Sequence, residues 1–329
     1  MLLAKALPDE FCRGYKGRLQ AINLHASPTD IIRHLRMHLN LHTEPEAVVL
    51  ANASGLRPEA FIKQHTLLPF FRAVAIQYSH VKHGDPASPA VIKHTAMKSA
   101  AQGAFLCPDC IAEDRNFWGI SYWRRTHQLP GIDWCLKHRT PLHVAPSIKA
   151  FDFLPGDIAE EAYPLPNGTL FLENAALQRY AEIAAGLLEF DQPLSPLVTG
   201  LVLMKRATNI GLPLSIQNKR PLLSYTILEQ LPHLWLFAHY PMLQNKAPER
   251  IHRALEIATQ HCHSSIPAVI TLTILFESAD EALSFWSAQF KDQPMQPNLQ
   301  RGTEPETLND KEIVNHGMAS KSSHTQGFR

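Results

Sequence analysis

Two short motifs in the middle of the chain carry residues that can bind a metal ion. Cys107 and Cys110 are separated by two residues, and after 24 further residues Cys135 and His138 repeat that separation. A gap of two residues lets one tight turn direct both side chains at the same point. Two such pairs supply the four ligands of a closed tetrahedral site, with no open position for a substrate. The spacing therefore predicts one structural zinc ion on these four residues.

The composition excludes several other classes of protein. The chain has 329 residues, of which 45% are hydrophobic, and two or three domains are expected at this length. No apolar run approaches the roughly 18–20 residues of a membrane span, and the apolar start is too short for a secretory signal. Cys12 and Cys262 stand alone, as free thiols do in a reducing compartment. We therefore expect a cytoplasmic protein that does not enter a membrane.

The charge is distributed unevenly along the chain. Residues 1–150 hold 18 Lys and Arg against 11 Asp and Glu, whereas residues 151–329 hold 13 against 19. A positive half can bind phosphates, because neutralised phosphates release their counterions. An ordinary solvated surface explains the same modest excess, so the charge gives only weak support for nucleic-acid binding.

Helical periodicity dominates the chain outside the cysteine motifs. Apolar residues recur at the spacing of an amphipathic helix over 28–40 and 174–188, and the pattern continues over 222–236 and 252–259. Residues 281–290 also have a helical pattern. The apolar run 267–276 fits a buried strand or a buried helix equally well. The fold class is therefore mainly α, with a helix-turn-helix region, a small central zinc-binding module and a C-terminal helical region. The expected segments are an N-terminal helical domain over 1–100, the zinc-binding module over 101–145, a C-terminal helical domain over 146–290 and a disordered tail over 291–329.

A candidate helix-turn-helix lies in the basic half. The stretch from Glu46 to Asn52 has a helical pattern, Gly55 can adopt the left-handed conformation of a turn, and Pro58 suits the start of a second helix. A small residue in the first helix, Ala51, lets the second helix approach, and the glycine forms the corner, as in a helix-turn-helix. A helical hairpin without DNA contact explains the pattern equally well. If the motif binds DNA, the residues on or near its recognition helix are Arg57, Lys63, Gln64 and His65.

The zinc-binding module carries a second group of polar candidates. Arg124, Arg125 and His127 can bind phosphate or a partner protein, and they are equally explained as surface residues. No nucleotide-binding loop, nucleophile elbow or metalloprotease helix is present. A zinc deaminase would leave Cys135 and His138 without a role. We therefore predict that the protein is not an enzyme.

Three stretches of the module, taken together, have a specific order of residues. They read FLCPDCIAED at 105–114, YWRRTHQLPG at 122–131 and CLKH at 135–138. This order resembles the signature of the TniQ/TnsD family of transposon target-selection proteins. The stretches 53–61 and 66–69 are similar, more loosely, to that family's helix-turn-helix region, and residues 7–10 resemble its usual opening. The resemblance covers roughly residues 7–143.

The resemblance implies target selection in DNA transposition. Members of this family mark an insertion site by binding an attachment sequence or a CRISPR-guided Cascade complex. They then recruit the AAA+ regulator TnsC without cutting DNA themselves. By this analogy Cys107, Cys110, Cys135 and His138 hold one structural zinc ion. The expected partners are TnsC, DNA, a Cascade complex and a second copy of the chain.

The chain departs from many members of the family in one respect. Residues 139–329 contain a single cysteine, Cys262, so a second zinc ribbon is not expected. This favours an adaptor that depends on protein partners. The alternative is a stand-alone sequence-specific DNA-binding protein, either a reader of an attachment site or a transcription regulator that uses residues 44–66.

Overall fold

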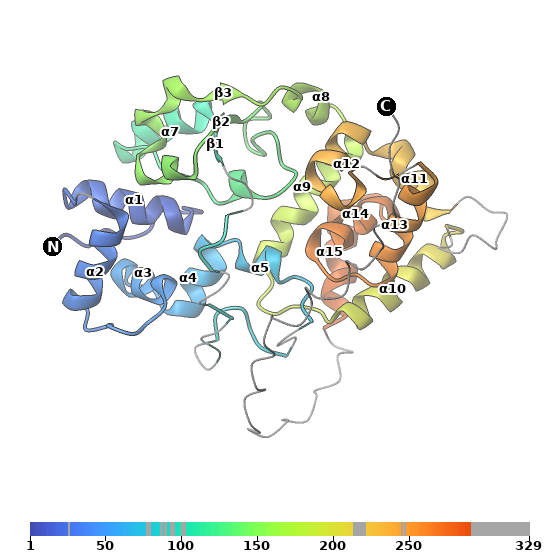
Figure 1. Ribbon diagram of the computed structural model, residues 1–329, viewed down its shortest axis with the longest axis horizontal. Helices are drawn as coiled ribbons and strands as arrows, with labels where there is room; N and C mark the ends of the chain where they lie inside the picture. Colours follow the sequence, from blue (N-terminus) through green and yellow to red (C-terminus); the bar gives the residue numbers. More distant parts are fainter. Residues whose placement is uncertain are drawn as a thin grey trace, which may run out of the picture. The chain divides into compact units, whose positions relative to one another are not determined.

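The computed structural model describes residues 1–25, 27–76, 80–85, 88, 91–92, 96–99, 103–212, 222–244, 246 and 248–290. The described chain is mainly helical, as predicted, with one small sheet (Figure 1). The expected tail over 291–329 lies outside these residues. Among the described residues, no helix combines the length and hydrophobicity that crossing a bilayer would take. The α-helices are α1 (Cys12–Ile22), α2 (Pro28–His38), α3 (Glu46–Ser54), α4 (Pro58–His65), α5 (Leu68–Phe71), α7 (Pro108–Trp118), α8 (Gly168–Leu172), α9 (Ala175–Gly186), α10 (Pro196–Asn209), α11 (Leu223–Gln230), α12 (His233–His239), α13 (Pro248–Gln260), α14 (Ser265–Leu275) and α15 (Ala279–Ala288).

The helices of the N-terminal region follow the apolar periodicity of the sequence. α2 buries Ile31, Ile32 and Leu35 on one face, which confirms the helix expected there. α3 and α4 pack against each other across the turn at Gly55, whose φ of 77° is left-handed. Glycine adopts this conformation without steric cost, so the chain can reverse direction within three residues. The hairpin is present, and DNA binding by it stays a prediction.

The C-terminal helices settle one point that the sequence left open and divide one segment that was expected to be helical. The apolar run near 267–276 is helix α14, which is buried on all sides and packs on α9. The pattern over 222–236 is divided into α11 and α12, which meet at Pro232. Proline has no N–H to donate and a fixed φ, so it ends the first helix and precedes the second.

A three-stranded antiparallel sheet supports the cysteine motifs, and the sequence did not predict it. The strands are β1 (Ala104–Leu106), β2 (His143–Ala145) and β3 (Tyr163–Pro164), in that order. Phe105 of β1 lies opposite Val144 of β2. Strands of two or three residues are too short to show the alternation of apolar and polar residues that identifies a strand in a sequence.

The N-terminal segment is hydrogen-bonded to the module that carries the cysteines. Asp9 accepts from Arg125 Nε at 2.9 Å and from the Thr126 hydroxyl at 2.7 Å. The backbone N–H of Phe11 donates to the carbonyl of Trp123 at 2.7 Å. The rings of Phe11 and Trp123 both pack edge-on against Phe151. We call the contact of residues 9–11 with residues 123–126 the docking seam.

A buried ion pair lies beside the docking seam. Glu10 is fully buried and accepts two hydrogen bonds of 2.7 Å from Nε and Nη2 of Arg18. Burial raises the pKa of the Glu10 carboxyl, and the guanidinium of Arg18 acts against that rise. The carboxylate therefore depends on Arg18 for its stability in the interior.

The C-terminal helices pack on the other end of the module. Tyr180 of α9 donates its hydroxyl to the carbonyl of Pro130, and Trp235 of α12 donates Nε1 to the carbonyl of Gly131, both at 3.0 Å. Gly131 has a φ of 79°, and a Cβ there would lie 2.6 Å from the ring of Trp235. Only glycine allows this approach. One buried core thus includes residues from 1–100, 101–145 and 146–290, the first three expected segments. The division of the chain into four segments stays a prediction.

The ion pair beside the docking seam yields a stability prediction. Glu10→Gln leaves Arg18 buried without a counter-charge, so we expect the free energy of unfolding to fall by about 3–5 kcal/mol in a urea titration. Arg33→Gln is the control, because Arg33 forms an exposed ion pair with Asp30. The control should change stability by at most about 1 kcal/mol. Equal losses in the two variants would contradict the importance of the buried pair.

Candidate metal centre

The first pair of cysteines lies where β1 passes into α7. Cys107 is the N-cap of α7 in an extended conformation, and Cys110 lies in the first turn of the helix. Pro108 occupies the first helical position, where its missing N–H costs nothing. Both thiols therefore lie at the positive end of the helix dipole, which favours thiolates.

The second pair lies in a tight turn stabilised by backbone hydrogen bonds. The N–H of Cys135 donates to the carbonyl of Thr140, and the N–H of Arg139 donates to the carbonyl of Cys135, both at 2.8 Å. The N–H of His138 points at Sγ of Cys135 at 3.5 Å. Arg139 has a φ of 54°, which reverses the chain directly after the histidine.

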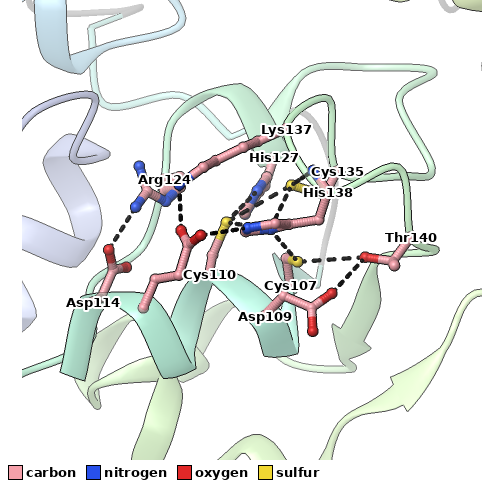
Figure 2. Close-up of polar contacts among 11 residues, drawn as sticks. Cys107, Asp109, Cys110, Asp114, Arg124, His127, Cys135, Lys137, His138 and Thr140 are labelled. Carbon is pink, nitrogen blue, oxygen red and sulfur yellow. Dashed lines mark hydrogen bonds and ion pairs between the residues drawn. The ribbon is translucent and has the colours of Figure 1, made fainter. Parts of the chain in front are cut away.

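The four predicted ligands converge on one point (Figure 2). Nδ1 of His138 lies 3.4 Å from Sγ of Cys107, 3.4 Å from Sγ of Cys110 and 3.6 Å from Sγ of Cys135. The sulfurs of Cys110 and Cys135 are 3.7 Å apart. All four ligand atoms lie within 4.8 Å of one another, and the three cysteines are buried. This arrangement can hold one metal ion.

The protonation of the thiols also points to a cation. Hydrogen bonds from Cys110 and Cys135 lower the pKa of the Cys107 thiol, so one sulfur is readily ionised. The hydrogen bond with Cys107 raises the pKa of the Cys110 thiol, because a second thiolate so close would be repelled. A divalent ion bound between the sulfurs would remove this conflict and favour the deprotonated form of all three.

Side chains around the four ligands hold the imidazole in place. Nε2 of His138 lies 2.9 Å from Oε1 of Glu113, a charge contact that favours a proton on Nε2 and leaves Nδ1 free to bind a metal. Lys137 is paired with the same carboxylate, whose pKa is lowered by the hydrogen bonds from Lys137 and His138. The Thr140 hydroxyl lies 3.6 Å from Sγ of Cys107 and donates to Asp109.

A comparison with known protein families found one match in the part of the chain that holds the cluster. Residues 2–142 match the family model TniQ. This part of the chain is a TniQ domain. No curated protein matches the chain. All four ligands and both sides of the docking seam lie inside the TniQ domain.

Three of the polar residues predicted to contact DNA or a partner lie inside the TniQ domain's interior. His65 donates Nδ1 to the carbonyl of Glu10, and burial lowers its pKa to about 4. Arg125 pairs with Asp9 in the docking seam and donates to the carbonyl of Lys63. Nε2 of His127 lies 3.8 Å from Sγ of Cys110. Their placement gives no support to a contact with DNA or a partner, because internal contacts occupy them.

Burial also decides the charge of His127, which supports the metal ligands. Burial lowers the pKa of His127 to about 4, so the imidazole is neutral at pH 7. A neutral imidazole can donate its Nε2 hydrogen to the Cys110 sulfur, and such contacts around a metal site tune its ligands. No pattern in the sequence indicated this role, because His127 lies 17 residues from Cys110 along the chain.

The remaining predicted contact residues lie at or near the surface. Arg57 and Gln64 are exposed, and Lys63 is half-buried and paired with Asp191. Arg124 is half-buried, pairs with Asp114 and lies over the ring of Tyr122. Contact of these residues with DNA or a partner stays a prediction.

Sequence reasoning also missed residues of the TniQ domain that position the centre. Gln128 donates Nε2 to the carbonyl of Phe105 at 2.7 Å and accepts from the N–H of Phe105 at 3.0 Å. Its amide therefore pairs with the backbone of β1 as a neighbouring strand would, two residues before Cys107. Glu113 was equally unassigned, although it lies three residues after Cys110, the last residue of the first cysteine motif.

Loss of one ligand should release the metal. Elemental analysis of the unaltered protein should find about one metal ion per chain. We expect Cys107→Ser to lose this ion and the TniQ domain to unfold as a result. Cys262→Ser is the matched control, because this buried thiol lies outside the cluster. Full metal content in the Cys107 variant would show that the thiol is not a ligand.

Loss of the carboxylate beside His138 should weaken metal binding without abolishing it. We expect Glu113→Gln to lower metal affinity roughly 10–100-fold in a competition with a chelator, because contacts behind metal ligands have effects of this size. Glu160→Gln, outside the cluster, should leave the affinity unchanged. Unaltered metal affinity in the Glu113 variant would mean that the carboxylate does not orient the imidazole.

Proposed function

We propose that the protein is a target-selection factor in DNA transposition that acts as a non-catalytic adaptor. The observation that carries this proposal is the TniQ match over residues 2–142, which includes the complete set of metal ligands. A TniQ domain suggests a transposition-associated role in target selection, and TniQ is a family of adaptors. In this role the protein links target DNA or a Cascade complex to the AAA+ regulator TnsC.

The proposed metal is one structural zinc ion. In a tetrahedral zinc site with Zn–S bonds of about 2.3 Å and Zn–N bonds of about 2.0 Å, two sulfurs lie about 3.8 Å apart and a sulfur and a nitrogen about 3.5 Å apart. The corresponding distances here are 3.7 Å for Cys110 to Cys135 and 3.4 to 3.6 Å for the sulfurs to His138. Three thiolates and one imidazole form a typical zinc donor set.

A closed set of four protein ligands supports a structural role for the ion. Catalytic zinc keeps a coordination position for water or substrate, and four protein ligands leave none. The zinc would instead fix β1, α7 and the turn after Cys135 relative to one another. The surface around them would then be rigid before a partner binds, which lowers the entropy cost of association.

A stand-alone DNA-binding protein is the second candidate. It is favoured by the α3–α4 hairpin, which leaves Arg57 and Gln64 exposed. A protein that reads DNA alone must bind one sequence much more tightly than others and lose affinity steeply with salt. An adaptor needs only weak binding to naked DNA, because its partners supply the specificity.

A reconstituted binding experiment separates the two functions. We expect the zinc-loaded protein to bind naked DNA weakly in a mobility-shift titration and to join a stable complex only when TnsC or a Cascade complex is added. Cys107→Ser should abolish complex formation, whereas Cys262→Ser should not. Nanomolar binding of the protein alone to a single DNA sequence would rule out the adaptor.

A further inference from the structure

A small cavity lies between the start of α4 and the loop of residues 82–85. Its volume is about 470 Å³, and its walls include Arg57, Glu59, Lys63, Lys82, His83 and Gly84. A Cβ on Gly84 would lie 2.5 Å from the Cα of Glu59 and 3.3 Å from its backbone nitrogen. The absence of a side chain at Gly84 therefore lets the loop close directly over the first turn of α4.

The first turn of α4 offers hydrogen-bond donors to this cavity. The N-cap residue Arg57 makes no side-chain capping bond, and Pro58 occupies the first helical position. The amides of Glu59 and Ala60 therefore have no acceptor within the helix. An uncapped helix start attracts anions, because free N–H groups and the helix dipole act together.

His83 gives an independent indication of a missing acceptor. Its side chain is 2% exposed, and Nδ1 lies 3.3 Å from Nη1 of Arg72. A guanidinium can only donate, so Nδ1 accepts and the ring hydrogen is on Nε2. Nε2 is buried and has no hydrogen-bond partner in the described part of the chain. A buried donor of this kind is unfavourable unless a ligand accepts from it.

The charges around the cavity narrow the chemistry of that ligand. Arg57 and Lys82 are exposed and form no ion pair within the described residues, whereas Lys63 pairs with Asp191 at 3.1 Å. Carboxylates of Glu59 and Asp85 also line the cavity. The net charge is therefore small, and directed donors must hold the ligand. A cavity with a small net charge and directed hydrogen-bond donors suits an anion with a single charge better than a dianion.

We propose that this cavity binds one phosphodiester group of a DNA backbone. A phosphodiester carries one negative charge and two free oxygens, which can accept from the helix amides, from His83 Nε2 and from the two unpaired cations. The site is separate from the metal centre, and the proposal for a phosphodiester stands on the cavity alone. The choice of DNA as its source rests on the proposed function.

A titration of the zinc-loaded full chain with dimethyl phosphate tests the site, with inorganic phosphate as a second arm. Dimethyl phosphate should shift the backbone amide NMR signals of Glu59 and Ala60, and it should bind more tightly than inorganic phosphate. The double variant Arg57→Gln with Lys82→Gln should lose this response. Its matched control is Lys205→Gln with Arg253→Gln, two exposed cations of α10 and α13, which should respond like the unaltered protein.

The variant His83→Phe distinguishes a specific binding site from a diffuse positive surface. It removes the buried Nε2 donor and keeps an aromatic ring at this position. It should also lose the response to dimethyl phosphate. No response in the unaltered protein, an unchanged response in His83→Phe, equal loss in the control, or tighter binding of inorganic phosphate would each overturn the proposal.

A duplex DNA arm identifies the source of the phosphate. The slope of log affinity against log salt should fall by about one in the Arg57 and Lys82 double variant, because the cavity contributes one phosphate contact and each such contact contributes about one. An unchanged slope would overturn DNA as the ligand. Failure of transposition with dimethyl phosphate binding intact would instead refute only the proposed function. Zinc content is measured for every variant.

Discussion

Four ligand atoms from two distant stretches must lie within one coordination sphere, and this requirement organises the middle of the protein. β1 delivers Cys107 to the start of α7, and the turn after Cys135 brings His138 to face it. The chain between the two pairs has to leave the centre and return within 24 residues. Three sulfurs at this separation repel one another when ionised, and a cation bound between them would remove that repulsion.

The remaining residues of the three signature stretches connect this centre to the helices on both sides. Arg125 and Thr126 bind Asp9 in the docking seam, and Pro130 and Gly131 accept hydrogen bonds from the C-terminal helices. Most residues of the three signature stretches therefore make contacts inside the protein. Exposed residues suited to contact a partner are few within these three stretches.

The sequence predicted what depends on short-range spacing and failed where distant residues meet. The ligand set followed from two pairs of residues, and α2 followed from its periodicity. The burial of Arg125 was not predictable, because charged residues are usually exposed and its partner Asp9 is 116 residues away. The sheet was missed because its strands are too short to show a pattern, and α14 was ambiguous because it is apolar on every side.

Gly131 ties the packing of the TniQ domain to the particular helices that follow it. The rings of Tyr180 and Trp235 fill the space that a side chain at residue 131 would need, and both bind its immediate backbone. A TniQ domain joined to an unrelated C-terminal segment would expose to water the surface beside Gly131 that these two rings cover. Another C-terminal segment would restore this packing only if it supplied aromatic rings of its own beside Gly131.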